Sequence, residues 1–116
     1  MGMKHIKNAQ KMDIASLNIE GINVFLEDVG SSNDSNAPIS YGLFRMEAGN
    51  PLEYTYSYEE CKNILEGEMT IQEVGGETTN VSPGDVLSFS KGTKVIFSSK
   101  SSGLAFYCGQ RKQGEL

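Results

Sequence analysis

The sequence predicts an all-β domain whose strands close into a single barrel or sandwich. Short apolar stretches alternate with polar residues at a period of two, which is typical of strands with one buried face. Turn-forming residues separate these stretches at short, even spacing, and no long stretch repeats with the period of an α-helix. The chain has 116 residues, of which 38% are hydrophobic, and this is enough for one core but not for two.

The positions of the turns predict about nine short strands. Residues 30–38 are rich in Gly, Ser, Asn and Asp and are expected to form a mobile loop. Gly75-Gly76 is expected to be a two-residue hairpin turn, because both positions of such a turn need positive φ. Ser82-Pro83-Gly84-Asp85 fits a type II turn, with Pro second and Gly third. Residues 110–116 are expected to be a polar tail. The predicted strands are 22–28, 39–47, 54–58, 60–65, 69–74, 77–81, 86–89, 94–98 and 104–108.

Charge and composition exclude several classes of partner. The formal net charge of −5 argues against nucleic acid and anionic membranes, since both select basic surfaces. No apolar stretch has the length of a membrane span, and residues 1–10 have no apolar signal core, so we expect a cytoplasmic protein. Cys61 and Cys108 are expected to be reduced, buried thiols, and no Cys–His pair indicates a cysteine nucleophile.

Three tyrosines form the most informative local pattern. Tyr54, Tyr56 and Tyr58 alternate with Thr55 and Ser57, so in a strand they share one face. Two interpretations stay open at this point. The tyrosines are part of the barrel core with their hydroxyls at its mouth, or they line a pocket for a small organic ligand.

The order of the turns resembles the double motif of the cupin superfamily between about Ile39 and Tyr107. Glu60 and Gly67 fall at the glutamate and glycine of the first motif, and Gly84 opens the second. The resemblance implies one cupin-type domain over residues 1–116, a double-stranded β-helix or jelly-roll barrel with its core at about 20–109.

The histidines of a metal-dependent cupin are missing from this chain. Tyr54 and Tyr56 stand at the positions of the first two, and Val95 stands at the position of the third. Tyrosine is a poor ligand at neutral pH because its pKa is about 10. The single histidine, His5, lies far from the motif. We therefore expect no metal and no other cofactor.

Within the cupins, the pattern is similar to the EutQ family of ethanolamine-utilization proteins. The shared segments are 54–60, 64–68 and 83–86, whereas Tyr54 replaces a frequent Trp and Ser90 a frequent Pro. This resemblance implies a bacterial protein of ethanolamine catabolism, associated with a microcompartment. Acetate kinase activity has been attributed to the family.

Glu60 is the predicted functional carboxylate, because the cupin position directs it into the barrel. As a candidate catalytic acid or base, it needs a partner when buried. Tyr54, Tyr56, Tyr58 and Lys62, which shares its strand face, are the predicted ligand-binding residues. Arg45 is a candidate contact for an anion, although a position facing solvent is the alternative for this side chain.

The favoured function is a metal-free accessory protein that binds a small organic metabolite. The alternatives are an enzyme, either acetate kinase-like or an isomerase that uses Glu60, and a cupin that senses a sugar or another ligand. A kinase needs several cations around the phosphoryl group, and only Arg45, Lys62, Lys91 and Lys94 are available near the barrel. We expect a homodimer in which residues 14–19 extend a sheet across chains, and microcompartment proteins as further partners.

Overall fold

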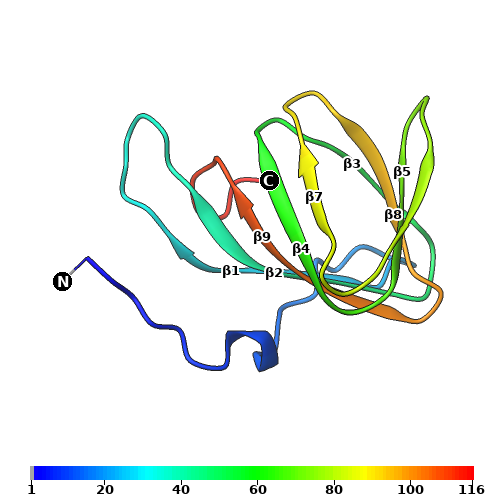
Figure 1. Cartoon of the computed structure of the whole chain (residues 1–116), viewed down its shortest axis with the longest axis horizontal. Coiled ribbons are helices and arrows are strands. Elements are labelled where there is room, and N and C mark those ends of the chain that lie inside the picture. The colour runs from blue at the N-terminus through cyan, green and yellow to red at the C-terminus, as the bar shows by residue number, and fades with distance from the viewer. Residues whose placement is uncertain (1) are drawn as a thin grey trace.

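The computed structural model describes residues 2–116 and confirms the all-β prediction (Figure 1). No helix among these residues is long and apolar enough to cross a membrane. The described part of the chain contains one 3-10 helix, η1 (Ala9–Lys11), and nine strands: β1 (Val24–Ser31), β2 (Ser40–Glu47), β3 (Leu52–Thr55), β4 (Glu60–Gly67), β5 (Met69–Glu73), β6 (Thr78–Val81), β7 (Val86–Phe89), β8 (Lys94–Ser98) and β9 (Ser102–Gly109).

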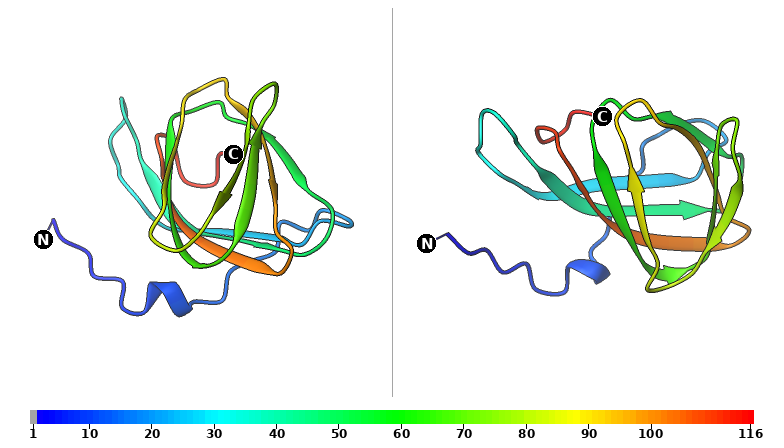
Figure 2. Two further views of the ribbon diagram at one scale, coloured as in Figure 1. Left: turned by 45° about the vertical axis from the view of Figure 1, so that its right-hand side comes forward. Right: turned by 45° about the horizontal axis from the view of Figure 1, so that its top comes forward.

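The strands form two antiparallel sheets that enclose the core. One sheet has the order β1-β2-β9-β4-β7 and the other the order β3-β8-β5-β6, so the chain repeatedly crosses from one sheet to the other, as in a jelly roll. Figure 2 shows the resulting barrel, with the C-terminal segment curling across its open end. Apolar side chains that alternate along the strands fill the interior, including Val24, Phe44, Met46, Ile64, Met69, Val95, Phe97 and Ala105.

Turn chemistry sets several of the strand ends. The Ser82–Asp85 turn forms as predicted, with Gly84 at φ +97° and the Asp85 amide donating to the Ser82 carbonyl at 3.1 Å. The Gly75-Gly76 prediction is wrong in detail. Only Gly75 has positive φ, and the Gly76 amide donates to the Glu73 carbonyl at 2.8 Å. Four residues, rather than two, therefore connect β5 to β6.

Several other predicted strand ends differ from those in the structure, two of them close to Glu60. The tyrosine strand ends at Thr55, although the Tyr56 amide still donates to the carbonyl of Thr93, in the turn before β8. Strand β4 continues through the expected break at Glu66-Gly67, and its register against β9 shifts in a bulge just before it, between Ile64 and Glu66.

Within residues 14–19, the segment expected to extend a sheet across chains, residues 15–17 pair with β1 of the same chain. The Leu17 amide donates to the Val24 carbonyl, and the Leu26 amide donates to the Ala15 carbonyl, each at 3.0 Å. This edge of the sheet is therefore partly covered by the chain's own backbone.

The two cysteines are free, but the prediction that both are buried is wrong for Cys61. It is exposed, Cys108 is half-buried, and the register places the two directly opposite each other on β4 and β9. Both point to the outer face, because Lys62 and Tyr107 beside them point into the barrel.

Gly67 is the position where backbone packing leaves no room for a side chain. A Cβ there would lie 1.9 Å from the Ser102 carbonyl oxygen, and the φ of +73° disfavours other residues. We expect Gly67→Ala to lower the free energy of unfolding by at least about 2 kcal/mol in urea titrations. Gly76→Ala is the control, because its Cβ would meet nothing closer than 3.5 Å. Equal urea midpoints for the two variants would contradict this account of the packing at Gly67.

Candidate functional site

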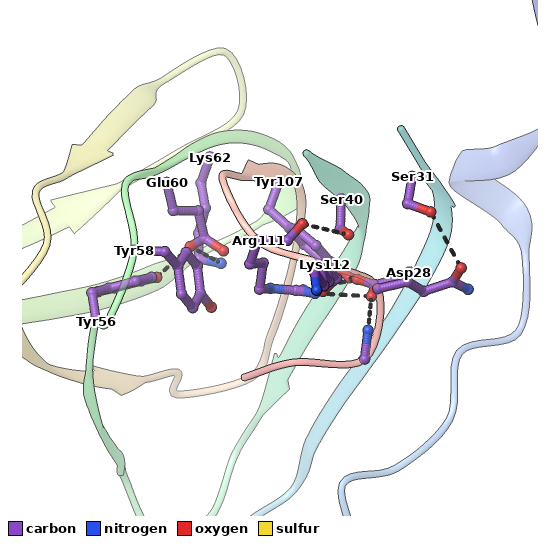
Figure 3. Close-up of polar contacts among 12 residues, drawn as sticks. Asp28, Ser31, Ser40, Tyr56, Tyr58, Glu60, Lys62, Tyr107, Arg111 and Lys112 are labelled. Carbon is purple, nitrogen blue, oxygen red and sulfur yellow. Dashed lines mark hydrogen bonds and ion pairs between the residues drawn. The ribbon is translucent and has the colours of Figure 1, made fainter. Parts of the chain in front are cut away.

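A buried ion pair lies at the open end of the barrel (Figure 3). Glu60 is the first residue of β4, and Lys62 follows it on the same face, so both side chains point inward. Their residues are only 5% and 3% exposed, and the Lys62 Nζ lies 3.0 Å from the Glu60 Oε2. The Tyr56 hydroxyl donates to this same oxygen. The Glu60 carboxylate is thus neutralised and hydrogen-bonded inside the protein.

The Lys62 ammonium is surrounded by aromatic rings on its other sides. It lies 4.4 Å from the ring centre of Phe44, 5.2 Å from that of Tyr107 and 5.5 Å from that of Phe97. These contacts are within the range of cation–π attraction. Burial lowers the pKa of Lys62 below its ordinary value, and the negative charge of Glu60 opposes this shift.

The three tyrosines come together beside the ion pair, as the alternating pattern predicts. The ring of Tyr56 meets those of Tyr54 and Tyr58 edge-on, at centre distances of 4.9 and 5.5 Å. The Tyr54 and Tyr58 hydroxyls share a hydrogen bond of 2.9 Å. Burial is the main cause that raises the pKa of all three phenols. They therefore stay protonated at neutral pH.

A small cavity lies beside the ion pair. Its volume is about 30 Å³, and it is bordered by the three tyrosines, Glu60, Lys62 and Leu116 of the C-terminal segment, among others. This is room for about two water molecules or for a short ligand fragment. A larger opening of about 530 Å³, between the β5–β6 hairpin and the β7–β8 turn, does not reach the ion pair.

A second buried charge pair, which the sequence analysis missed, fixes the C-terminal segment across the barrel end. Arg111, predicted to lie in a polar tail, is 4% exposed. Its Nη1 and Nη2 donate to the two Asp28 carboxylate oxygens at 2.9 and 2.8 Å. The Tyr107 hydroxyl and the Gly114 amide also donate to Asp28, at 2.5 and 2.8 Å. Burial alone would raise the pKa of Asp28, but these hydrogen bonds outweigh it and lower the pKa.

The structure brings Tyr54, Tyr56, Tyr58, Glu60 and Lys62 together and leaves Arg45 outside the site. Arg45 alternates with the core residues Phe44 and Met46 on β2, so its half-buried side chain is on the outer face.

The remaining candidate cations for a kinase are also outside the cavity. Lys91 and Lys94 are exposed, and Lys94 lies 3.6 Å from the Glu53 carboxylate.

The residues at the site do not fit the metal centre of a cupin. Val95 is packed in the core opposite Tyr54, and His5 is an exposed residue near the N-terminus. The Glu60 carboxylate already faces an ammonium group. Within residues 2–116, no three His, Cys, Asp or Glu side chains gather in a way that could hold a metal ion.

Comparisons with known proteins agree with the fold. The sequence matches the EutQ-like cupin domain over residues 35–103, more than half of the chain. No curated protein matches the sequence. A protein from Salmonella typhimurium LT2, described as ethanolamine utilization protein Q, has a similar structure with a TM-score of 0.66 and 26% identity. The alignment covers 76% of this chain and 69% of that chain.

Two further solved structures are similar at lower sequence identity. The EutQ protein of Clostridium difficile has a TM-score of 0.76 and 18% identity, over 89% of this chain and 77% of that one. The polyketide cyclase RemF of Streptomyces resistomycificus has a TM-score of 0.77 and 14% identity, over 97% of this chain and 82% of that one. At these identities, the similarity is one of fold.

The ion pair gives a direct test of the electrostatics. Lys62→Met leaves Glu60 buried with no counter-charge, and we expect it to cost about 3–5 kcal/mol in the free energy of unfolding. Adding Glu60→Gln removes the unpaired charge. The free energy of unfolding of the double variant should therefore recover to within about 1–2 kcal/mol of that of the wild type. Urea titrations of both single variants and the double variant measure this coupling. Strictly additive losses would show that the two side chains do not stabilise each other.

Proposed function

This chain belongs to the EutQ-like cupin family, and we propose that it is a metal-independent protein that binds a small polar metabolite in its barrel. The observation that carries the proposal is the buried Glu60–Lys62 pair, which borders a cavity beside three tyrosines.

The physical argument is that this pair has no clear value for stability. Apolar residues of similar volume are often at least as stabilising as a buried ion pair. A barrel selected only for stability would therefore gain little from Glu60 and Lys62. Next to a cavity, the same groups can bind a ligand: Glu60 accepts hydrogen bonds, Lys62 donates them, and tyrosine hydroxyls do both.

We also propose that the protein serves ethanolamine-linked catabolism as a cytoplasmic accessory protein, with microcompartment proteins among its partners. The family match and the similarity to the Salmonella protein support this assignment. Genetic neighbourhood tests it: a gene that lies outside any ethanolamine operon, and whose deletion leaves growth on ethanolamine unchanged, would argue against it.

A second candidate function is catalysis by proton transfer, such as an isomerisation. The hydrogen-bonded series Tyr56–Glu60–Lys62 at the cavity wall favours it, because Glu60 can exchange a proton with a bound substrate. The acetate kinase alternative has less support, since the other candidate cations, Arg45, Lys91 and Lys94, lie outside the cavity. Acetyl phosphate formation by the purified protein, dependent on Mg²⁺ and on Glu60, would reverse this preference.

The binding proposal is tested with the double variant Glu60→Gln/Lys62→Met, which keeps side-chain volume and removes the charge pair. A thermal-shift screen of small polar metabolites should find compounds that raise the melting temperature of the wild type. The double variant should bind these compounds at least about ten-fold more weakly, because hydrogen bonds to charged groups are lost.

Cys61→Ser is the matched control for this screen, since Cys61 lies between Glu60 and Lys62 but points outward. It should bind like the wild type. Equal affinity for the double variant and the wild type would remove the ion pair from the binding site.

We propose, in addition, that the protein is a homodimer that pairs through the outer face of its five-stranded sheet. Phe106, on the middle strand β9, is 38% exposed there. Light scattering should give twice the chain mass, and Phe106→Asp should shift it toward the monomer. Val74→Asp, in the β5–β6 connection, is the control and should stay dimeric. A wild type of monomer mass at micromolar concentration would refute the proposal.

A further inference from the structure

The two cysteines form a pair on the outer face of the five-stranded sheet. They lie on the neighbouring strands β4 and β9, and the register places Cys61 directly opposite Cys108 (Figure 1). Side chains at directly opposite positions of an antiparallel sheet stand side by side on one face. Both cysteines are free, and the chain has no third one. The fold alone therefore holds the two thiols together.

The backbone hydrogen bonds show how far apart the two cysteines are. The Gln110 amide donates to the Glu59 carbonyl at 2.8 Å, so these two residues are a hydrogen-bonded pair. Such pairs alternate with non-hydrogen-bonded pairs along antiparallel strands, and Cys61 and Cys108 are two residues further along. They are therefore also a hydrogen-bonded pair, in which the Cα atoms are about 5.5 Å apart. Disulfide-bonded cysteines have Cα atoms about 4.4–6.8 Å apart, so this separation allows a bond.

A disulfide at this position would be easily reduced. The Cβ atoms of a hydrogen-bonded pair are about 5.5 Å apart, whereas a disulfide requires about 3.5–4.5 Å. The two strands must therefore move closer at this point when the bond forms, and their pairing with β2 and β7 resists the movement. Disulfides that are strained or exposed are the ones that thiols reduce readily. The pair is thus suited to reversible oxidation rather than to a permanent cross-link.

The pair is open to reagents from solvent. Cys61 is exposed, and both cysteines border a shallow depression of about 420 Å³ on the surface. Phe106, through which we propose that the dimer forms, does not border this depression. Cys108 is half-buried, and burial is the main cause that raises the pKa of its thiol. A reagent therefore meets Cys61 first, with Cys108 beside it.

We propose that Cys61 and Cys108 are a redox-sensitive modification site, at which a low-molecular-weight disulfide oxidises the pair to an intrachain disulfide. The Cys61 thiolate attacks one sulfur of the reagent, which forms a mixed disulfide and releases one thiol. The Cys108 thiolate then attacks the Cys61 sulfur and releases the second thiol. Two protein thiols are oxidised, one reagent disulfide is reduced, and the two protons end on the released thiols. In reducing compartments, disulfides are usually of this transient, redox-sensing kind.

Intact-mass spectrometry of the full chain tests this inference. The charged side chains that border the depression, Glu59 and Glu60, are acidic, so the probe is the neutral hydroxyethyl disulfide. After the remaining thiols are alkylated, the folded wild type should have the mass of one chain with an intrachain disulfide and no adduct. Cys108→Ser should stop at a mixed disulfide on Cys61. Millimolar 2-mercaptoethanol should return both thiols of the wild type.

A variant with two thiols out of register is the matched control. In Cys61→Ser/Asn63→Cys, one thiol moves two residues along the outer face of β4, to the position opposite Phe106. The two thiols are then diagonal neighbours about 7–8 Å apart, which is too far for a disulfide without backbone movement. The intrachain disulfide should form at least about ten-fold more slowly than in the wild type. In concentrated urea the two rates should become equal, because only the folded sheet distinguishes the two positions.

Several results would overturn the inference. Wild type that accumulates mixed disulfides without an intrachain bond would show that the two thiols react independently. A product of twice the chain mass in place of the intrachain disulfide would show that the cysteines pair between chains. Equal rates for the folded wild type and the shifted variant would exclude the register as the cause, and a bond that survives millimolar 2-mercaptoethanol would be structural. None of these results bears on metabolite binding in the barrel, which fails or stands by the thermal-shift screen.

Discussion

Two carboxylates enter the barrel at its open end, Glu60 from β4 and Asp28 from β1, and each has to be neutralised there. An unpaired charge in such an interior would cost several kcal/mol, which is a large part of a small domain's stability. Lys62 neutralises Glu60 and Arg111 neutralises Asp28, with ion-pair distances of 3.0 and 2.8 Å. The aromatic side chains at this end pack around the two cations, so the composition of the site follows from the need to keep these charges paired.

This need also explains why the C-terminal segment lies across the barrel end. Arg111 lies just after β9, and its pairing with Asp28 draws the chain back over the barrel. The Gly114 amide then donates to the same carboxylate, which brings Leu116 to the edge of the small cavity. The segment therefore borders the small cavity, and removing the Asp28–Arg111 pair would change the shape of this cavity as well as the stability of the fold.

The sequence predicts the strands well where turn chemistry delimits them. Residues 86–89 and 94–98 are strands with the predicted bounds, because a Pro-Gly turn precedes one and a glycine turn the other. The position of Glu60 in the cupin pattern likewise predicts its inward orientation. Arg111 gives no such signal. It stands alone in a polar stretch, and its partner Asp28 is 83 residues away, so only the folded chain brings the two together.

The ammonium group that faces Glu60 influences what this end of the barrel can bind. In a metal-dependent cupin the glutamate faces a metal cation, whereas Glu60 faces Lys62, which cannot be lost or exchanged. An ammonium group has three N–H donors. Glu60 accepts from one, and the rings of Phe44, Phe97 and Tyr107 surround the ammonium group on other sides. An aromatic face is a weaker acceptor than an oxygen, so a ligand hydroxyl or carbonyl oxygen that reaches Lys62 can take over one of these donors while the ion pair with Glu60 stays intact.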